Sequence, residues 1–237
     1  MAGKRKRRSI LPVVLTICIM TVLIGVALAA FFFNRMNKVS GEWTRDIDIT
    51  DEVISKSALW MSEIEGVHID MDWVKGVADK QGYKAVINLD LTMAETVRGQ
   101  GTYDLVVDTN SYDECKSDTY ALLAECLNRV VADRLTLVGY ADNVSADEAV
   151  AITEEVLGQS LESYLQSKNM DMVPGYEVLS DKYSSNGSYV FNTETITWTN
   201  DKAGETYTES YIVDSNMLIF PESEIIYRKQ VADEIGL

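Results

Sequence analysis

An uncharged stretch of 25 residues, from Ser9 to Phe33, divides this chain into two unlike parts. As a helix it would be about 37 Å long, enough to cross a bilayer core of ~30 Å with some tilt. The basic cluster at residues 4–8 precedes it, which predicts a cytoplasmic N-terminus. We therefore expect a protein of the cell membrane with a cytoplasmic tail (1–8), a single transmembrane helix (9–33), a linker (34–40) and an extracytoplasmic domain (41–237).

Two other interpretations of the apolar segment stay open. Residues 27–29, Ala-Leu-Ala, resemble a signal-peptide cleavage site before Ala30, but the apolar run exceeds the usual ~7–15 residues and continues through three phenylalanines. The second interpretation is a lipoprotein with its lipid attached to Cys18. The residue before Cys18 is Ile17 rather than a small residue, which disfavours lipid attachment. The length of the run favours an uncleaved anchor.

The chain beyond residue 38 is strongly acidic. Seven of the 21 basic residues and none of the 37 acidic ones lie within residues 1–38, so the remaining 199 residues carry a net charge of −23. Such a field repels nucleic acid, and we expect no nucleic-acid partner. Hydrophobic residues make up 46% of the whole chain, so the acidic part can bury a core of its own.

Alternation with period two predicts strands at both ends of the acidic part. In residues 41–50 the odd positions Trp43, Arg45, Ile47 and Ile49 alternate with acidic residues and threonines. Residues 83–107 predict a long antiparallel hairpin that turns at 98–101, and residues 186–229 predict five more short strands, one of them from Tyr207 to Val213. The total is about eight strands, at which a small barrel closes around side chains or one small ligand.

A helical insertion, about residues 111–183, separates the two sets of strands. Ser111 and Ser145 each precede a glutamate by three residues, the capping-box pattern, and apolar residues follow at three-and-four spacing. Gly139 ends the first helix and Lys168-Asn169 the second, which predicts an antiparallel αα-hairpin. Asp51 and Asp70 predict the starts of two earlier helices. The predicted fold class is α+β: a transmembrane helix, then an antiparallel β-barrel or curled sheet with an inserted αα-hairpin.

The strands resemble a known family. Gly41-Glu42-Trp43 on the first strand and Arg228 on the last are similar to the lipocalin and calycin barrels, in which an Arg packs over the Trp. The run from Gly204 through Ile219 also resembles lipocalin-like extracytoplasmic domains of Gram-positive bacterial single-pass membrane proteins. The resemblance implies a lipocalin-like barrel. The inserted helices depart from the family pattern, so an open cavity and a plugged barrel both stay possible.

Catalytic motifs are scarce. His68 is the only histidine, so one chain cannot supply the two or three His of a zinc site, and nothing marks a nucleophile for a triad. His68, Asp70 and Asp72 would share a face if extended, but too few oxygens are present for calcium, and helix capping by Asp70 would remove that alignment. Asp46, Asp48 and Asp51 likewise supply too few oxygen ligands for calcium. We expect no metal and no cofactor.

The sequence therefore predicts a membrane-anchored extracytoplasmic binding or interaction module, non-enzymatic, whose partner is a protein or a small apolar ligand. The predicted ligand-binding or barrel-closing residues are Trp43, Arg228, Trp198 and Tyr211. Two alternatives stay open: a cell-envelope hydrolase that uses paired carboxylates, and the extracytoplasmic subunit of a membrane protein complex.

Overall fold

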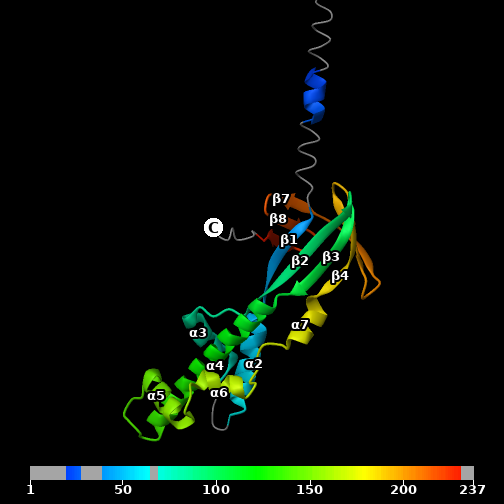
Figure 1. The fold of residues 1–237 in the computed structure, drawn as a ribbon. Helices are drawn as coiled ribbons and strands as arrows, with labels where there is room; N and C mark the ends of the chain where they lie inside the picture. The colour runs from blue at the N-terminus through cyan, green and yellow to red at the C-terminus, as the bar shows by residue number, and fades with distance from the viewer. Residues whose placement is uncertain (1–19, 28–38, 65–68, 231–237) are drawn as a thin grey trace, which may run out of the picture.

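The computed structural model describes residues 20–27, 39–64 and 69–230. Residues 20–27 are helical, and the rest of the predicted transmembrane segment lies outside the described residues. Within the described ranges, no helix has both the length and the apolar character needed to cross a membrane. Figure 1 shows an elongated domain, with a curled sheet at one end and a layer of helices at the other.

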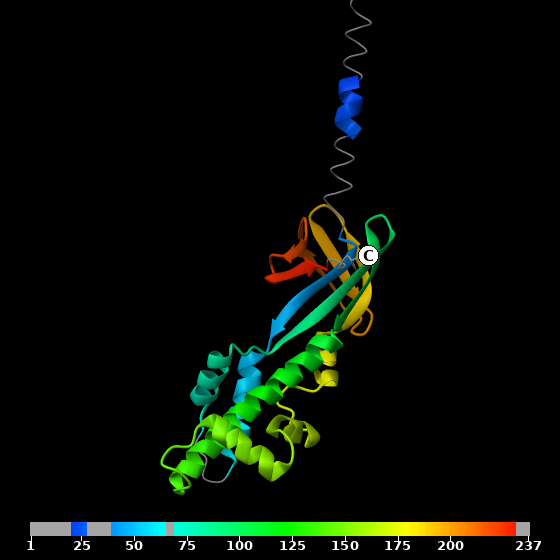
Figure 2. The same ribbon diagram turned by 60° about the vertical axis from the view of Figure 1, so that its left-hand side comes forward.

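Nine strands form one antiparallel sheet in the order β6-β5-β4-β3-β2-β1-β9-β8-β7. The strands are β1 (Gly41–Asp48), β2 (Val86–Val97), β3 (Gln100–Val107), β4 (Ser185–Phe191), β5 (Thr195–Asn200), β6 (Thr206–Ser210), β7 (Ile212–Asp214), β8 (Met217–Phe220) and β9 (Ile225–Lys229). The edge strands β6 and β7 are separated in the chain by Tyr211 alone. The sheet is therefore a nearly closed barrel (Figure 2), compatible with a lipocalin-like fold.

The predicted single strand from Tyr207 to Val213 is wrong, because Tyr211 interrupts it. The Tyr211 side chain is buried, and its hydroxyl donates a hydrogen bond to the Asn192 carbonyl at 2.6 Å. At this residue the chain leaves one edge of the sheet and begins the other edge. The barrel therefore has nine described strands where the pattern predicted about eight.

The predicted hairpin of residues 83–107 is confirmed as β2 and β3. Leu91 pairs with Leu105 and Met93 with Tyr103, and Gly99 takes a positive φ of 83° in the turn. Gly101 has no room for a side chain, since a Cβ there would lie 2.0 Å from the Ala94 carbonyl oxygen. The buried Tyr189 of β4 lies over this glycine, with its hydroxyl 2.7 Å from the same position.

The helices are α2 (Thr50–Ser62), α3 (Met71–Gln81), α4 (Thr109–Leu137), α5 (Ala146–Leu157), α6 (Leu161–Ser167) and α7 (Tyr176–Tyr183). The capping box at Ser145 and the cap at Asp70 are confirmed. The predicted helix after Ser145 ends early, because Gly158 adopts a left-handed conformation (φ 69°) and α6 restarts at Leu161.

The predicted capping box at Ser111 is wrong. Helix α4 is capped three residues earlier, where the side chain of Asp108 accepts the hydrogen bond from the Ser111 N–H at 2.8 Å. The Ser111 hydroxyl instead accepts a hydrogen bond from the Asn88 N–H on β2 at 2.9 Å. Ser111 therefore connects the start of the long helix to the sheet.

The two largest of the four apolar cores formed by the described residues adjoin each other. The barrel core contains inward side chains of seven strands, among them Trp43, Tyr103, Trp198 and Phe220. The second core joins the near ends of β1, β2 and β3 to α2, α4, α6 and α7. Leu105 packs against both cores, so barrel and helices form one continuous unit.

Both cysteines of α4, Cys115 and Cys126, are buried and free. Burial raises the pKa of Cys115 to about 11 and that of Cys126 to about 12, so both thiols stay protonated at neutral pH. They act as small apolar core residues.

Candidate functional site

Aromatic side chains fill the barrel. Trp43 and Tyr189 are each 1% exposed, and the Tyr103 and Trp198 ring centroids lie 4.9 Å apart in an edge-to-face contact. A cavity of about 50 Å³ lies between them, at the end where Leu105 meets the helical core. Pockets for small-molecule ligands are usually ~300–1,000 Å³, so this cavity is too small for a whole apolar ligand.

The structure brings three of the four predicted site residues into the barrel core. The indole N–H of Trp43 donates to the Val39 carbonyl at 2.9 Å, and that of Trp198 donates to Glu209 Oε1 at 2.8 Å. Tyr211 is the residue at the strand break. Their polar atoms are therefore occupied by groups of the same chain, as in packed core residues.

Arg228 lies apart from this set, on the outer face of β9. Its side chain is 75% exposed, and its Nη1 lies 4.0 Å from Asp46 Oδ2. The cation over Trp43 is the next residue, Lys229, with its Nζ 5.9 Å from the ring centroid. Because side chains alternate along a strand, Arg228 in this register faces away from Trp43, unlike the arginine that the resemblance implies.

A larger hollow, of about 630 Å³, is a cleft where the barrel meets the helices, which we call the junction cleft. It lies among the end of β1, the start of α2, the α3–β2 connection and the end of α7. Ile49 and Ile54 are its apolar residues, and Thr50, two tyrosines and seven charged side chains complete the lining: Tyr83, Tyr183, Asp48, Asp51, Glu52, Asp79, Lys75, Lys84 and Lys182.

Charges of both signs face this cleft. Asp51 pairs with Lys75 at 3.7 Å, and the Lys182 Nζ lies 4.8 Å from the Tyr183 ring centroid. Hydrogen bonds from Thr50 lower the pKa of Asp48, with a smaller contribution from the charge of Lys84. Asp48 is therefore ionised at neutral pH and has no proton to donate as a general acid.

Sequence reasoning missed two charged side chains that face into the barrel, Arg45 and Glu209. Arg45 follows Trp43 by two residues on β1, and Glu209 follows Tyr207 by two residues on β6, in register with the buried Ile196. The signal was present, because a charged residue occupied an inward position of the alternating pattern.

Of the residues that would share a face if residues 68–72 were extended, the structure places only Asp70 and Asp72. His68 lies outside the described residues. Asp70 caps α3 by accepting the Trp73 N–H at 2.9 Å, and Asp72 lies in the first turn of that helix. In the described part of the chain, no three His, Cys, Asp or Glu residues are grouped closely enough to hold a metal ion.

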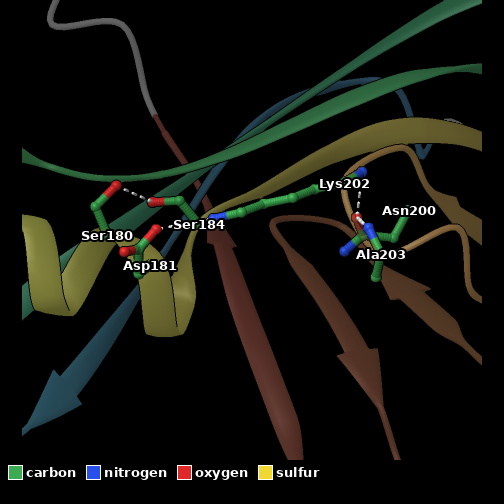
Figure 3. Close-up of polar contacts among 6 residues, drawn as sticks. All are labelled: Ser180, Asp181, Ser184, Asn200, Lys202 and Ala203. Carbon is green, nitrogen blue, oxygen red and sulfur yellow. Dashed lines mark hydrogen bonds and ion pairs between the residues drawn. The ribbon is translucent and has the colours of Figure 1, made fainter.

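Figure 3 shows polar contacts that link α7 to the β5–β6 turn. The Lys202 ammonium lies 2.8 Å from the Asp181 carboxylate of α7. The Asn200 side chain accepts hydrogen bonds from the N–H groups of Lys202 and Ala203, which fixes the turn. These contacts are exposed, so they orient the end of the helix and contribute little to stability.

Comparisons with protein-family models, curated proteins and solved structures find no match for this chain. The class is therefore defined by the fold and the site: a nearly closed antiparallel barrel with a filled interior and a mixed-charge cleft at its junction with a helical layer.

Proposed function

We propose that this protein is a membrane-anchored extracytoplasmic binding module, related to the lipocalin-like domains of Gram-positive membrane proteins, that contacts its partner at the junction cleft. The observation that carries the proposal is the contrast in volume between the barrel cavity, about 50 Å³, and the cleft, about 630 Å³. A lipocalin-type carrier needs space inside the barrel, whereas an interaction module needs a surface site on a rigid scaffold.

The charges of the cleft lining favour a partner that carries both positive and negative groups. Lys84 and Lys182 present ammonium groups, Asp48 and Asp79 present carboxylates, and Tyr183 offers an aromatic ring. A protein segment has all the complementary groups, and charges at the rim mainly set its specificity and association rate. The partner is thus a polypeptide rather than an apolar small molecule.

A charge reversal tests the site in full-length protein. We expect Lys84→Glu to impair rescue of a deletion strain, and Lys80→Glu, the same change on an exposed α3 residue outside the cleft, to rescue normally. Equal amounts of folded protein in the membrane fraction must be confirmed for both. Normal rescue by Lys84→Glu would show that the partner does not bind at the junction cleft.

A hydrolase is the second candidate, because four carboxylates line the cleft. Loss of a general acid or base costs ~10²–10⁴-fold in rate. Asp48→Asn and Asp79→Asn separate the two functions: in a binding module each removes one rim charge, which changes mainly the association rate and leaves rescue largely intact. A well-folded carboxylate variant that behaves like the deletion would favour the hydrolase.

The orientation follows from the basic cluster at residues 4–8 before the apolar run. Protease added to spheroplasts should digest residues 39–237 and leave the N-terminal tail intact. Protection of the large domain would overturn the orientation. A mature N-terminus at Ala30 would replace the anchor with a cleaved signal peptide.

A further inference from the structure

Strand β1 is paired along its whole length on one side only. All eight of its residues pair with β2, whereas its ladder with β9 contains only Trp43 and Thr44. In that register Asp46 would come opposite Ile226, but among the described strands Ile226 pairs with β8 alone. Strand β9 therefore leaves β1 after Thr44. We call the stretch that has no described strand on this side, residues 45–48, the β1 free edge.

The backbone hydrogen bonds of β1 alternate between its two sides. The Ile49 N–H donates to the Ala85 carbonyl on the β2 side at 2.8 Å, and the Glu42 carbonyl accepts the N–H of the residue that follows β9 at 3.0 Å. Odd residues thus turn their backbone groups toward β2, and even residues turn theirs toward β9. The N–H and C=O groups of Asp46 and Asp48 therefore point out of the free edge, where no described strand pairs with them.

The β1 free edge is accessible and leads into the junction cleft. Asp46 and Asp48 are exposed, and Asp48 also lines the cleft, beside the start of α2 into which β1 continues (Figure 1). The register of residues 45–48 with β2 is regular and contains no bulge. The free edge thus has the backbone geometry that pairing with a further strand requires.

The chemistry of the free edge favours one kind of occupant. A row of outward N–H and C=O groups is matched by another extended backbone, which repeats the same groups at the same spacing. Asp46 and Asp48 lie on one face of the strand, so basic side chains opposite them are favourable. A second copy paired through the same edge would set aspartate against aspartate, which is unfavourable.

We propose that the partner polypeptide adds an extended segment as a strand to the β1 free edge, beside Asp46 and Asp48, and continues into the junction cleft. The side chains of this segment alternate, with basic residues opposite the two aspartates and an apolar residue opposite Ile47. The inference rests on the function proposed above, because it describes how a polypeptide occupies the cleft.

The first test uses wild-type full-length protein in detergent at physiological ionic strength. The probe is the hexapeptide acetyl-Lys-Val-Lys-Val-Lys-Val-amide. One derivative carries N-methyl groups on the backbone nitrogens of the three lysines, the side that would face Asp46 and Asp48. A matched derivative carries them on the three valines, the opposite side. Both derivatives keep the charge of the probe, so a general attraction to the acidic domain affects them equally.

Titration calorimetry compares the three peptides. We expect the valine-methylated peptide to bind like the unmodified probe, and the lysine-methylated peptide to bind about tenfold more weakly or worse, because it lacks the N–H donors that pair with β1. Equal binding of the two methylated peptides, or no binding of the unmodified probe, would overturn strand addition.

Two variants of Asp46 separate the backbone of β1 from its charge. Asp46→Ala and Asp46→Pro both remove the carboxylate, but only proline removes the N–H. That N–H belongs to no described ladder, so its loss breaks no pairing within the sheet. We expect Asp46→Pro to bind the unmodified hexapeptide about tenfold more weakly than Asp46→Ala. Equal affinities in the two folded variants would overturn the proposal, and the methylated peptides test it without any variant.

Rescue of a deletion strain separates this inference from the function proposed for the cleft. We expect Asp46→Pro to impair rescue and Asp46→Ala to rescue, at equal amounts of folded protein. Impaired rescue by Lys84→Glu with normal rescue by Asp46→Pro would keep the cleft and overturn strand addition. The reverse result would keep strand addition and show that the partner does not bind at the junction cleft.

Discussion

The rings of Trp198 on β5 and Phe220 on β8 pack across the barrel with their centroids 5.8 Å apart. Five strands lie between β5 and β8 in the order of the sheet, so a flat sheet would hold these residues far apart. The contact exists because the sheet curls until its edges nearly meet. Side-chain packing thus closes the barrel at the place where the described strands β6 and β7 form no ladder.

Truncation of either ring should therefore destabilise the whole domain. We expect Trp198→Ala and Phe220→Ala each to cost ~3–5 kcal/mol of unfolding free energy. The double variant should fall short of the sum by at least ~0.5 kcal/mol, because the residues are in contact. Urea unfolding measures all three, with Val190→Ala on the exposed face of β4 as the control. Strict additivity would argue against the contact.

Leu89 and Asp90 are adjacent on β2 but face opposite sides of the sheet. Leu89 is fully buried in the core shared with the helices, so Leu89→Ala should cost ~2–5 kcal/mol. Asp90→Ala should cost much less. Urea unfolding at neutral pH compares the two, and similar losses would show that the assignment of the faces is wrong.

Asp90 also predicts a pH dependence. Burial raises the pKa of its carboxyl group, although Gln230 donates a hydrogen bond to it at 2.7 Å. A raised pKa in the folded state means that ionisation favours the unfolded state once the pH exceeds the ordinary value of 3.8. We expect Asp90→Asn to be more stable than the wild type at pH 7. The difference should shrink as the pH falls and vanish below about pH 3, and a pH-independent difference would contradict this.

Two glycines should respond oppositely to alanine. In Gly101→Ala the new Cβ would meet the backbone oxygen of Ala94, so we expect a loss of ~1–3 kcal/mol or more. In Gly76→Ala nothing lies within 4 Å and the residue is inside α3, so we expect a gain of up to ~1 kcal/mol. Thermal and urea unfolding check both; a tolerated Gly101→Ala would refute the close approach of the Ala94 carbonyl to this position.

The ion pair between Asp181 and Lys202 should contribute little despite its short distance. The two side chains are 78% and 64% exposed, and solvent-exposed pairs are worth ~0–1 kcal/mol. A double-mutant cycle with Asp181→Asn and Lys202→Met measures the coupling. We expect it to disappear in 1 M salt; a coupling that persists there would indicate a shielded pair.

Much of the local structure was predictable. The alternation of residues 83–107 specified the hairpin and its inward face, and Ser145 and Asp70 were recognisable caps. These features depend on groups within a few residues of one another, so the chain determines them locally. Ser111 failed as a cap because Asp108 caps α4 while the Ser111 hydroxyl bonds to β2, a competition that no local pattern reveals.

The sequence by itself determined most of the elements, the alternation of faces and the strong acidity of the domain. Tertiary structure decided that the chain changes edges at Tyr211, that Lys229 rather than Arg228 covers Trp43, and that Arg45 faces a tyrosine ring without an acidic partner. It also decided that aromatic rings fill the barrel and leave the larger hollow at the junction with the helices. The physical reason is distance along the chain: these outcomes depend on packing between residues often more than a hundred positions apart, which local periodicity does not encode.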